Sequence, residues 1–283
     1  MRLVDTHAHI NFNAFKDDGD EVIKRSLEAG VGMIVVGSEA RTSKRAIDYA
    51  NRYDRGVWAA VGLHPTHLFV ARVEGDDYNF VTSGEDFDNE IYGKLAAFSK
   101  VVAIGEIGLD YYHLEQFAAT LDEIKEKQQR VLSQQLVLAV KRELPVLIHC
   151  REAHNDLLPL LRDFRREYRQ LLPVNRPWGV LHCFSGNEGL AKEYFNLGLL
   201  VSFTGLITFC HDWDHLIKKL PADKFLVETD CPFMTPVPFR GQRNEPGLVS
   251  LAAERIAQLK NWTLMRVAET TTPNARSLFN IDW

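Results

Sequence analysis

Two histidines separated by a single residue close the first apolar run of the chain, Leu3-Val4-Asp5-Thr6-His7-Ala8-His9. Successive side chains of a β-strand point to opposite faces, so Asp5, His7 and His9 are expected to share one face. Two imidazoles on one face of a strand end can bind a single divalent cation. The pair therefore predicts a metal site at the end of the first strand.

Further histidines and carboxylates follow later apolar runs. They are His64 after 57–61, Glu106 and Asp110 after 101–104, His149 after 146–148, His182 after 179–181, and Glu228 and Asp230 after 225–227. Taken singly, each has a structural interpretation: a strand-end histidine usually makes a hydrogen bond, and Asp230 fits an N-cap of the turn at Pro232. Their joint occurrence at strand ends favours a set of metal ligands, with Glu228 as a supporting partner.

Short apolar runs alternate with longer amphipathic stretches along the whole chain. Strands are expected to start at Leu3 and to span 33–36, 57–61, 101–104, 146–148, 179–181, 199–203 and 225–227. Helices are expected at 17–29, 41–52, 91–98, 115–142, 157–168, 188–197, just before Leu220, at 248–260 and at 263–279. This order predicts an α/β fold, a single (β/α)₈ TIM barrel over residues 1–283, whose functional face is the C-terminal end of the strands. An open doubly wound sheet is the alternative, although no glycine-rich nucleotide loop supports it.

Composition and charge narrow the class of protein. The chain has 283 residues, 46% of them hydrophobic and 25% charged, which suits one barrel of about 250 residues. Its four cysteines form no CxxC pair and are expected to be reduced thiols, typical of a cytoplasmic protein. No signal peptide and no membrane-length apolar run is recognisable, so no membrane partner is expected. The net charge of −5 argues against a broad basic surface for nucleic acid.

Six candidate ligands exceed the needs of one closed site, which favours a pair of ions bridged by a carboxylate. The candidates are His7, His9, Glu106, His149, His182 and Asp230. Two divalent ions would bring +4, and the carboxylates of Glu106 and Asp230 would bring −2. The local charge near +2 would attract a phosphodiester even though the protein is negative overall.

Several ordered motifs resemble the TatD family of metal-dependent deoxyribonucleases, among the amidohydrolase-like barrels. They are Val4-Asp5-Thr6-His7-Ala8-His9, Gly62-Leu63-His64-Pro65, Gly105-Glu106-Ile107-Gly108-Leu109-Asp110-Tyr111-Tyr112, Ile148-His149-Cys150-Arg151-Glu152-Ala153-His154, His182-Cys183-Phe184-Ser185-Gly186, Glu228-Thr229-Asp230-Cys231-Pro232 and Arg243-Asn244-Glu245-Pro246. The resemblance implies that His7, His9 and Asp230 hold one ion, that His149 and His182 hold a second, and that Glu106 bridges both. Many relatives in the wider superfamily use a modified lysine where this chain has Glu106, which fits TatD.

The resemblance also implies hydrolysis of DNA phosphodiester bonds, as a 3′-to-5′ exonuclease acting on single strands or 3′ ends. The cofactors would be two Mg²⁺, Mn²⁺ or Zn²⁺ ions with a bridging water as nucleophile. Asp230 would accept the proton of that water, and His64 would contact a phosphate oxygen or the leaving group. We expect a monomer. A metal-dependent esterase or amidohydrolase, acting for example on aminoacyl-tRNA esters, remains an alternative, and so does a metal-binding barrel without catalysis.

Other features carry less defined expectations. The acidic segment 73–89 is expected to be a long loop or insertion, and segment 165–178 is longer than the family suggests, so both bear on substrate access and partner surfaces. Arg240 and Arg243 fit either a phosphate contact or a solvated loop. The remaining histidines are expected at the surface: His67, His113, His154, His211 and His215. Four aromatic residues are candidates for stacking on unpaired bases or for the core: Tyr111, Tyr112, Phe184 and Phe209.

Overall fold

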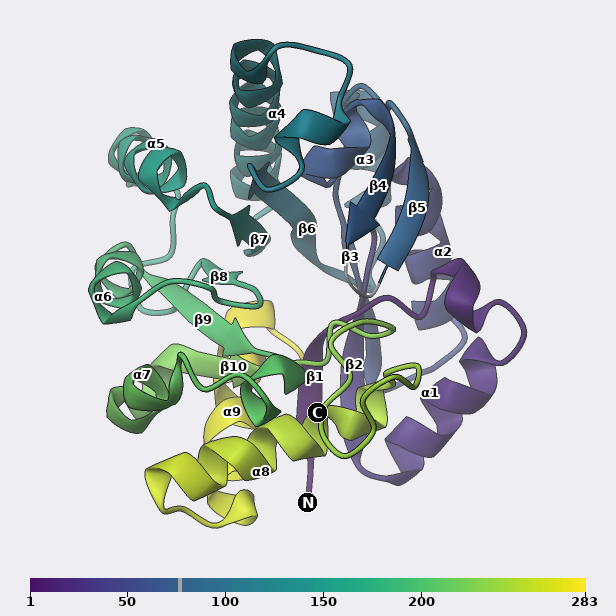
Figure 1. Cartoon of the computed structure of the whole chain (residues 1–283), viewed down its shortest axis with the longest axis vertical. Coiled ribbons are helices and arrows are strands. Elements are labelled where there is room, and N and C mark those ends of the chain that lie inside the picture. Colours follow the sequence, from purple (N-terminus) through teal and green to yellow (C-terminus); the bar gives the residue numbers. More distant parts are fainter. Residues whose placement is uncertain (76–77) are drawn as a thin grey trace.

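Eight parallel strands form one sheet in the computed structural model, which describes residues 1–75 and 78–283. In sheet order they are β1 (Leu3–Ala8), β2 (Val31–Val36), β3 (Val57–Val61), β6 (Val101–Asp110), β7 (Val146–Arg151), β8 (Gly179–Leu181), β9 (Leu199–Phe203) and β10 (Phe225–Val227). Sequence order and sheet order agree throughout. Figure 1 shows the strands at the centre of a ring of helices.

The first and last strands meet, so the sheet is a nearly closed barrel. Ala8 forms a parallel bridge with Cys231, and the backbone N–H of Asp230 donates to the carbonyl of His7 over 2.9 Å. The His9 N–H donates to the carbonyl of Cys231 over 2.8 Å. The predicted barrel is therefore confirmed, and the open-sheet alternative is wrong.

The helices surround the strands (Figure 1). They are α1 (Gly19–Glu28), α2 (Ala40–Ala50), α3 (Asn89–Leu95), α4 (Leu121–Lys141), α5 (His154–Glu167), α6 (Glu188–Asn196), α7 (Asp214–Lys219), α8 (Val249–Lys260) and α9 (Leu264–Phe279). Helix α4 begins six residues later than its hydrophobic pattern predicted, because Thr120 and Glu123 form a reciprocal capping box at its N-terminus. Among the described residues, no helix combines the length and hydrophobicity needed to cross a membrane.

A buried apolar cluster occupies the end of the barrel where the strands begin. Strand residues such as Val4, Val102 and Leu226 pack there against the last residues of α9. The indole N–H of Trp283 donates to the carbonyl of Leu3 over 2.9 Å and ties the C-terminal segment to this end. The polar residues at the opposite, C-terminal end of the strands are therefore the ones that face the mouth of the barrel.

Strand β6 is longer than predicted and includes Glu106, which the sequence pattern had placed after the strand. Two glycines of this strand allow a close approach to β7. A side chain at Gly105 would come within 2.4 Å of the Leu147 Cβ, and one at Gly108 within 1.9 Å of the His149 carbonyl oxygen. Glycine therefore continues the strand here, because no larger residue fits against β7.

Segment 73–89, expected to be a long loop or insertion, is part of an insertion between β3 and β6, and most of its described residues form strands and not a loop. Strands β4 (Val70–Gly75) and β5 (Tyr78–Ser83) form an antiparallel hairpin, while residues 76–77 of the expected loop lie outside the described residues. Val73 is buried against Leu114, Phe117 and Ile124, so one face of the hairpin has a core of its own. The polar composition concealed a strand pair whose residue Val73 packs against the protein.

Segment 165–178 completes α5 and then runs to the start of β8. It thus lies at the end of the barrel where strands begin, opposite the mouth. Trp178 is buried there, and its indole N–H donates to the carbonyl of Leu197 over 2.6 Å. The segment lines an apolar cavity of about 160 Å³ between α4 and α5, so it does not border the predicted site.

Candidate metal centre

His7 and His9 converge as their spacing predicted. Their Nε2 atoms lie 3.1 Å apart, and the Nε2 of His9 is 3.3 Å from an Asp230 carboxylate oxygen. The Nε2 of His7 is 3.8 Å from the same oxygen. Residues from the first strand and from the segment after the last strand therefore form one triad, because barrel closure brings those strand ends together.

Asp5 does not join this triad, although it is on the same strand. Its carboxylate accepts the backbone N–H of Thr229 over 2.9 Å and also the Thr229 hydroxyl. Burial raises the pKa of Asp5 well above its usual value. Asp230 follows Thr229 with a left-handed backbone (φ 55°), so Asp5 holds the turn that aims the Asp230 carboxylate at the histidines.

Glu106 lies at the centre of the imidazoles and is 5% exposed. One carboxylate oxygen is 3.3 Å from the Nε2 of His7 and 3.7 Å from that of His9. The other oxygen is 2.8 Å from the Nε2 of His182 and 3.0 Å from the Nδ1 of His149. The two oxygens thus face two separate histidine pairs, which is the arrangement expected of a bridging carboxylate.

The distances between these donor atoms fit divalent ions. Two ligands about 2.05 Å from a tetrahedral zinc ion lie about 3.3 Å apart. His149 Nδ1 and His182 Nε2 are 3.3 Å apart, and the His7–His9 and His9–Asp230 distances are 3.1 and 3.3 Å. The same distances also fit an N–H···N hydrogen bond between two imidazoles, so a metal ion at this position would replace a shared proton. The residues present therefore fit a metal centre.

Hydrogen bonds on the far side of two imidazoles, and a carboxylate behind a third, set which nitrogen faces the centre. The Nδ1 of His9 donates to the Val36 carbonyl over 2.9 Å, and the Nε2 of His149 donates to Asp110 over 3.1 Å. The Nδ1 of His182 lies 3.4 Å from Glu228. A proton on each outer nitrogen leaves the lone pair of the inner nitrogen available for a metal ion.

Asp110 is among the strand-end carboxylates but not among the six candidate ligands, although it lies four residues beyond Glu106 and therefore on the same face of the strand. Asp110 is 1% exposed, and its carboxylate also accepts the Nδ1–H of His113 over 2.9 Å. Burial alone would raise its pKa, but the hydrogen bonds from His113 and His149 lower it well below its usual value. Asp110 is therefore ionised and orients His149.

His64 differs from the other imidazoles at the site. The backbone N–H of Thr66 donates to its Nδ1 over 3.2 Å, so the proton of the neutral ring belongs on Nε2, which is 3.3 Å from Glu106. Burial lowers the pKa of His64 to about 4. His64 is thus a neutral imidazole, and its Nε2 lies close enough to Glu106 and His149 for the three side chains to hold a metal ion; its role as a substrate contact stays a prediction.

The electrostatics of the site favour a cation. Burial would raise the pKa of Glu106, but the nearby imidazoles of His64 and His182 lower it well below its usual value. Burial likewise opposes a charge on His182, yet Glu106 raises the pKa of His182 well above its usual value. Burial would also raise the pKa of Asp230, which the hydrogen bond with His9 lowers. The ionised carboxylates stabilise positive charge on the inner nitrogens, so protons and metal ions compete for the same atoms.

Three of the five histidines expected at the surface are not exposed. His67 and His113 are buried, and His154 is partly buried, with its Nδ1 2.9 Å from the Tyr194 hydroxyl. His67 and His113 contact carboxylates, Glu39 at 3.5 Å and Asp110 at 2.9 Å, which makes their burial favourable. His211 and His215 are exposed, as predicted.

The loop that carries the two candidate phosphate-binding arginines packs onto the barrel. The Arg243 guanidinium makes two hydrogen bonds to Asp18, over 2.8 and 2.6 Å, and one to Glu245 over 3.0 Å. Arg240 lies over the ring of Phe209 at 4.1 Å and donates to the Thr235 carbonyl. Arg243 thus joins the loop to the start of α1 through ion pairs, and its role as a phosphate contact stays a prediction.

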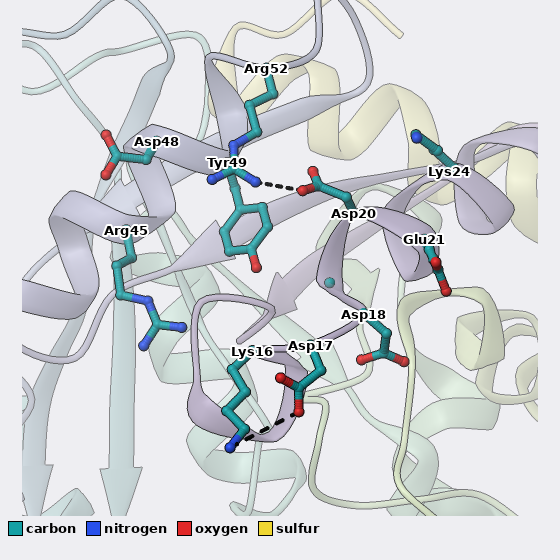
Figure 2. Close-up of a pocket in the computed structure, with 11 residues that line it drawn as sticks. Lys16, Asp17, Asp18, Asp20, Glu21, Lys24, Arg45, Asp48, Tyr49 and Arg52 are labelled. Atoms are coloured by element: carbon teal, nitrogen blue, oxygen red, sulfur yellow. Dashed lines mark hydrogen bonds and ion pairs between the residues drawn. The ribbon is translucent and has the colours of Figure 1, made fainter.

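A separate cavity of about 470 Å³ lies where the residues just before and within α1 face α2 (Figure 2). Its lining is charged: Arg52 pairs with Asp20 at 2.5 Å, and the neighbouring residues Lys16 and Asp17 pair at 4.0 Å. None of the seven candidate site residues lines this cavity. It is a surface crevice held by ion pairs, distinct from the histidine cluster.

Comparison with known proteins agrees with this site. A family model described as TatD related DNase matches residues 4–280. YabD of Bacillus subtilis, described as an uncharacterized metal-dependent hydrolase, is 37% identical, covering 99% of this chain and 100% of that protein. A protein of Pectobacterium carotovorum named 3′-5′ ssDNA/RNA exonuclease TatD is 31% identical, with the same coverage. The crystal structure of YjjV, a TatD homologue from Escherichia coli, is 30% identical with a TM-score of 0.81 over 99% of both chains.

A barrel whose strand ends bring four imidazoles around a buried carboxylate defines a metal-dependent hydrolase. The match over nearly the whole chain makes the assignment more specific. The chain belongs to the TatD family.

Proposed function

We propose that this hydrolase is a deoxyribonuclease that removes nucleotides from the 3′ end of single-stranded DNA. The observation that carries the proposal is the position of Glu106, whose two oxygens face the His7–His9 pair and the His149–His182 pair. A bridging carboxylate between two histidine pairs supports a centre of two divalent ions. The name of the Pectobacterium relative supports a nucleic-acid substrate.

Bound divalent ions would neutralise phosphate charge and lower the pKa of an attacking water toward neutrality. The protein supplies the ligands: His7, His9 and Asp230 for one ion, His149 and His182 for the other, with Glu106 shared. Five of these six side chains are buried and His149 is partly buried, so they lie in a low-dielectric environment that would strengthen their interaction with a phosphodiester.

Two residues have further roles in the proposed reaction. Asp230 is the carboxylate that accepts the proton of the attacking water; its lowered pKa keeps it ionised at neutral pH, and 13% of its side chain is exposed toward the mouth. His64, as a neutral donor, contributes the Nε2–H to a phosphate oxygen or to the leaving oxygen. Both roles require these side chains to reach the substrate from the rim of the cluster.

The test is a nuclease assay on single-stranded DNA labelled at the 3′ or the 5′ end. Metal-stripped protein is supplied with Mg²⁺, Mn²⁺ or Zn²⁺, beside the variants Glu106→Ala and Asp230→Asn. We expect metal-dependent release of 3′ nucleotides by the wild type. We also expect loss of most turnover in Asp230→Asn with its fold retained, because the amide cannot accept the proton.

Several results would contradict the proposal. Wild-type-like turnover by Asp230→Asn would remove that residue from the reaction. Release of an amino acid from aminoacyl-tRNA, with intact DNA, would favour the esterase alternative. Full metal content with no turnover on either substrate would indicate a metal-binding barrel without catalysis.

A further inference from the structure

The four aromatic residues that were candidates for stacking on bases differ in their exposure to solvent. Phe184 is 3% exposed and belongs to the core. The Tyr111 hydroxyl donates to Asp156 over 2.8 Å, and Phe209 is half-buried beneath a guanidinium group. Tyr112 is 43% exposed. Among the four, only Tyr112 therefore presents a large area of its ring to solvent.

Tyr112 is tied to the metal centre through Asp110. Its backbone N–H donates to one Asp110 oxygen over 3.1 Å, while the other oxygen accepts from His149 over 3.1 Å. The ring of His113 packs edge-on against Tyr112, with ring centroids 4.9 Å apart. The same carboxylate therefore positions a candidate ligand and the exposed ring, which places the ring at the rim of the site.

The guanidinium group of Arg151 packs against the ring of Tyr112. The guanidinium carbon of Arg151 lies 3.7 Å from the Tyr112 ring centroid. Arg151 is two residues beyond His149 on β7, so both side chains leave the same face of the strand, about 7 Å apart along it. The guanidinium group thus lies one step outward from the candidate metal ligands, toward the opening of the barrel.

We propose that Tyr112 and Arg151 form a subsite for one unpaired nucleotide next to the bond that is cut. The base stacks on the exposed part of the Tyr112 ring, and the adjoining phosphate faces the Arg151 guanidinium. The inference rests on the proposed nuclease function and deepens it. A base within a duplex is already stacked on its neighbours, so this subsite selects single strands.

The test compares Tyr112→Leu with Tyr112→Phe, which keeps the ring, and with Phe98→Leu as a matched control. Phe98 is 50% exposed and lies three residues before the start of β6, at the opposite end of the barrel. Each metal-loaded protein is assayed on a single-stranded oligonucleotide and on bis(p-nitrophenyl) phosphate, a diester without bases. The oligonucleotide carries 2-aminopurine near its 3′ end, whose fluorescence falls when the base stacks on an aromatic ring.

We expect Tyr112→Leu to raise KM for the oligonucleotide about tenfold, as for loss of one base stack, and to abolish the fluorescence decrease. Turnover of the small diester stays within twofold of the wild type, and both other variants behave as the wild type does. Arg151→Gln raises KM for the oligonucleotide and flattens its dependence on salt, since one phosphate contact is lost.

Two outcomes overturn the subsite while leaving the nuclease proposal intact. One is an unchanged KM and fluorescence decrease in Tyr112→Leu. The other is an equal loss on both substrates, which would mean that the ring only supports the fold. Failure of the wild type to cut the oligonucleotide, while it hydrolyses the small diester, would instead refute DNA as substrate and the subsite with it.

Discussion

Replacing Asp110 with Asn tests whether hydrogen bonding sets the protonation of His149. One Asp110 oxygen accepts the backbone N–H groups of Tyr112 and His113, each over 3.1 Å, so the amide oxygen of Asn remains on that side. The amide NH₂ then faces the Nε2 of His149, where the carboxylate oxygen accepted a hydrogen bond over 3.1 Å. Two donors face each other unless His149 moves its proton to Nδ1, the atom that lies 3.0 Å from Glu106.

The expected changes in stability and in metal affinity follow from this change in hydrogen bonding. Loss of a buried hydrogen bond to a charged group is expected to lower the free energy of unfolding of the metal-free protein by about 1–3 kcal/mol. Protonation of the inner nitrogen of His149 removes one metal ligand, so metal affinity is expected to fall about 10- to 100-fold. The melting temperature of the metal-free protein should drop by a few degrees.

Three measurements check the prediction. Thermal denaturation of the metal-free protein gives the stability change, and competition with a chromophoric chelator gives the metal affinity. Long-range ¹H–¹⁵N spectra of histidine-labelled protein report which ring nitrogen carries the proton. Asp156→Asn is the control, because this half-buried carboxylate accepts from Tyr111 and Gln129 and contacts none of the candidate ligands. Wild-type metal affinity in Asp110→Asn would refute the reasoning.

Two further predictions concern ion pairs away from the histidine cluster, one of Glu39 and one of Arg243. His67 and Arg41 lie 3.5 and 2.8 Å from Glu39 and lower its pKa from 4.5 to about 2. The contribution of ionised Glu39 to the free energy of unfolding is present above pH 4.5 and is lost as pH falls toward 2, by up to about 3 kcal/mol. Chemical denaturation across this pH range should show a smaller loss of stability in Glu39→Gln than in the wild type. Identical pH profiles of the two proteins would contradict the assignment. Arg243→Met, which removes the two bonds to Asp18, is expected to lower the free energy of unfolding by about 1 kcal/mol with KM for DNA unchanged. A raised KM at unchanged stability would instead make Arg243 a phosphate contact.

The positions of the candidate ligands in the chain were predictable from local pattern. Eight apolar runs, each followed by a helical pattern, predicted the barrel, and the barrel places every strand's C-terminal end at one opening. His7, His9, His149, His182 and Asp230 needed no more than this rule to be brought together. Glu106 was found as well, although its strand is longer than predicted.

The details of the site depend on contacts between residues far apart in the chain, which no local periodicity encodes. The hydrogen bond between His149 and Asp110 joins residues 39 positions apart in the chain. Glu106 on β6 lies 2.8 Å from His182, which follows β8, so one strand of the sheet lies between them. Tyr111 and Tyr112 are neighbours in the chain, but only packing shows that the first is engaged with α5 and the second is exposed. The sequence by itself determined the barrel and the residue types at its mouth. The tertiary structure alone decided which nitrogen of His9 and of His149 faces the centre, because that depends on the hydrogen-bond partner behind the ring.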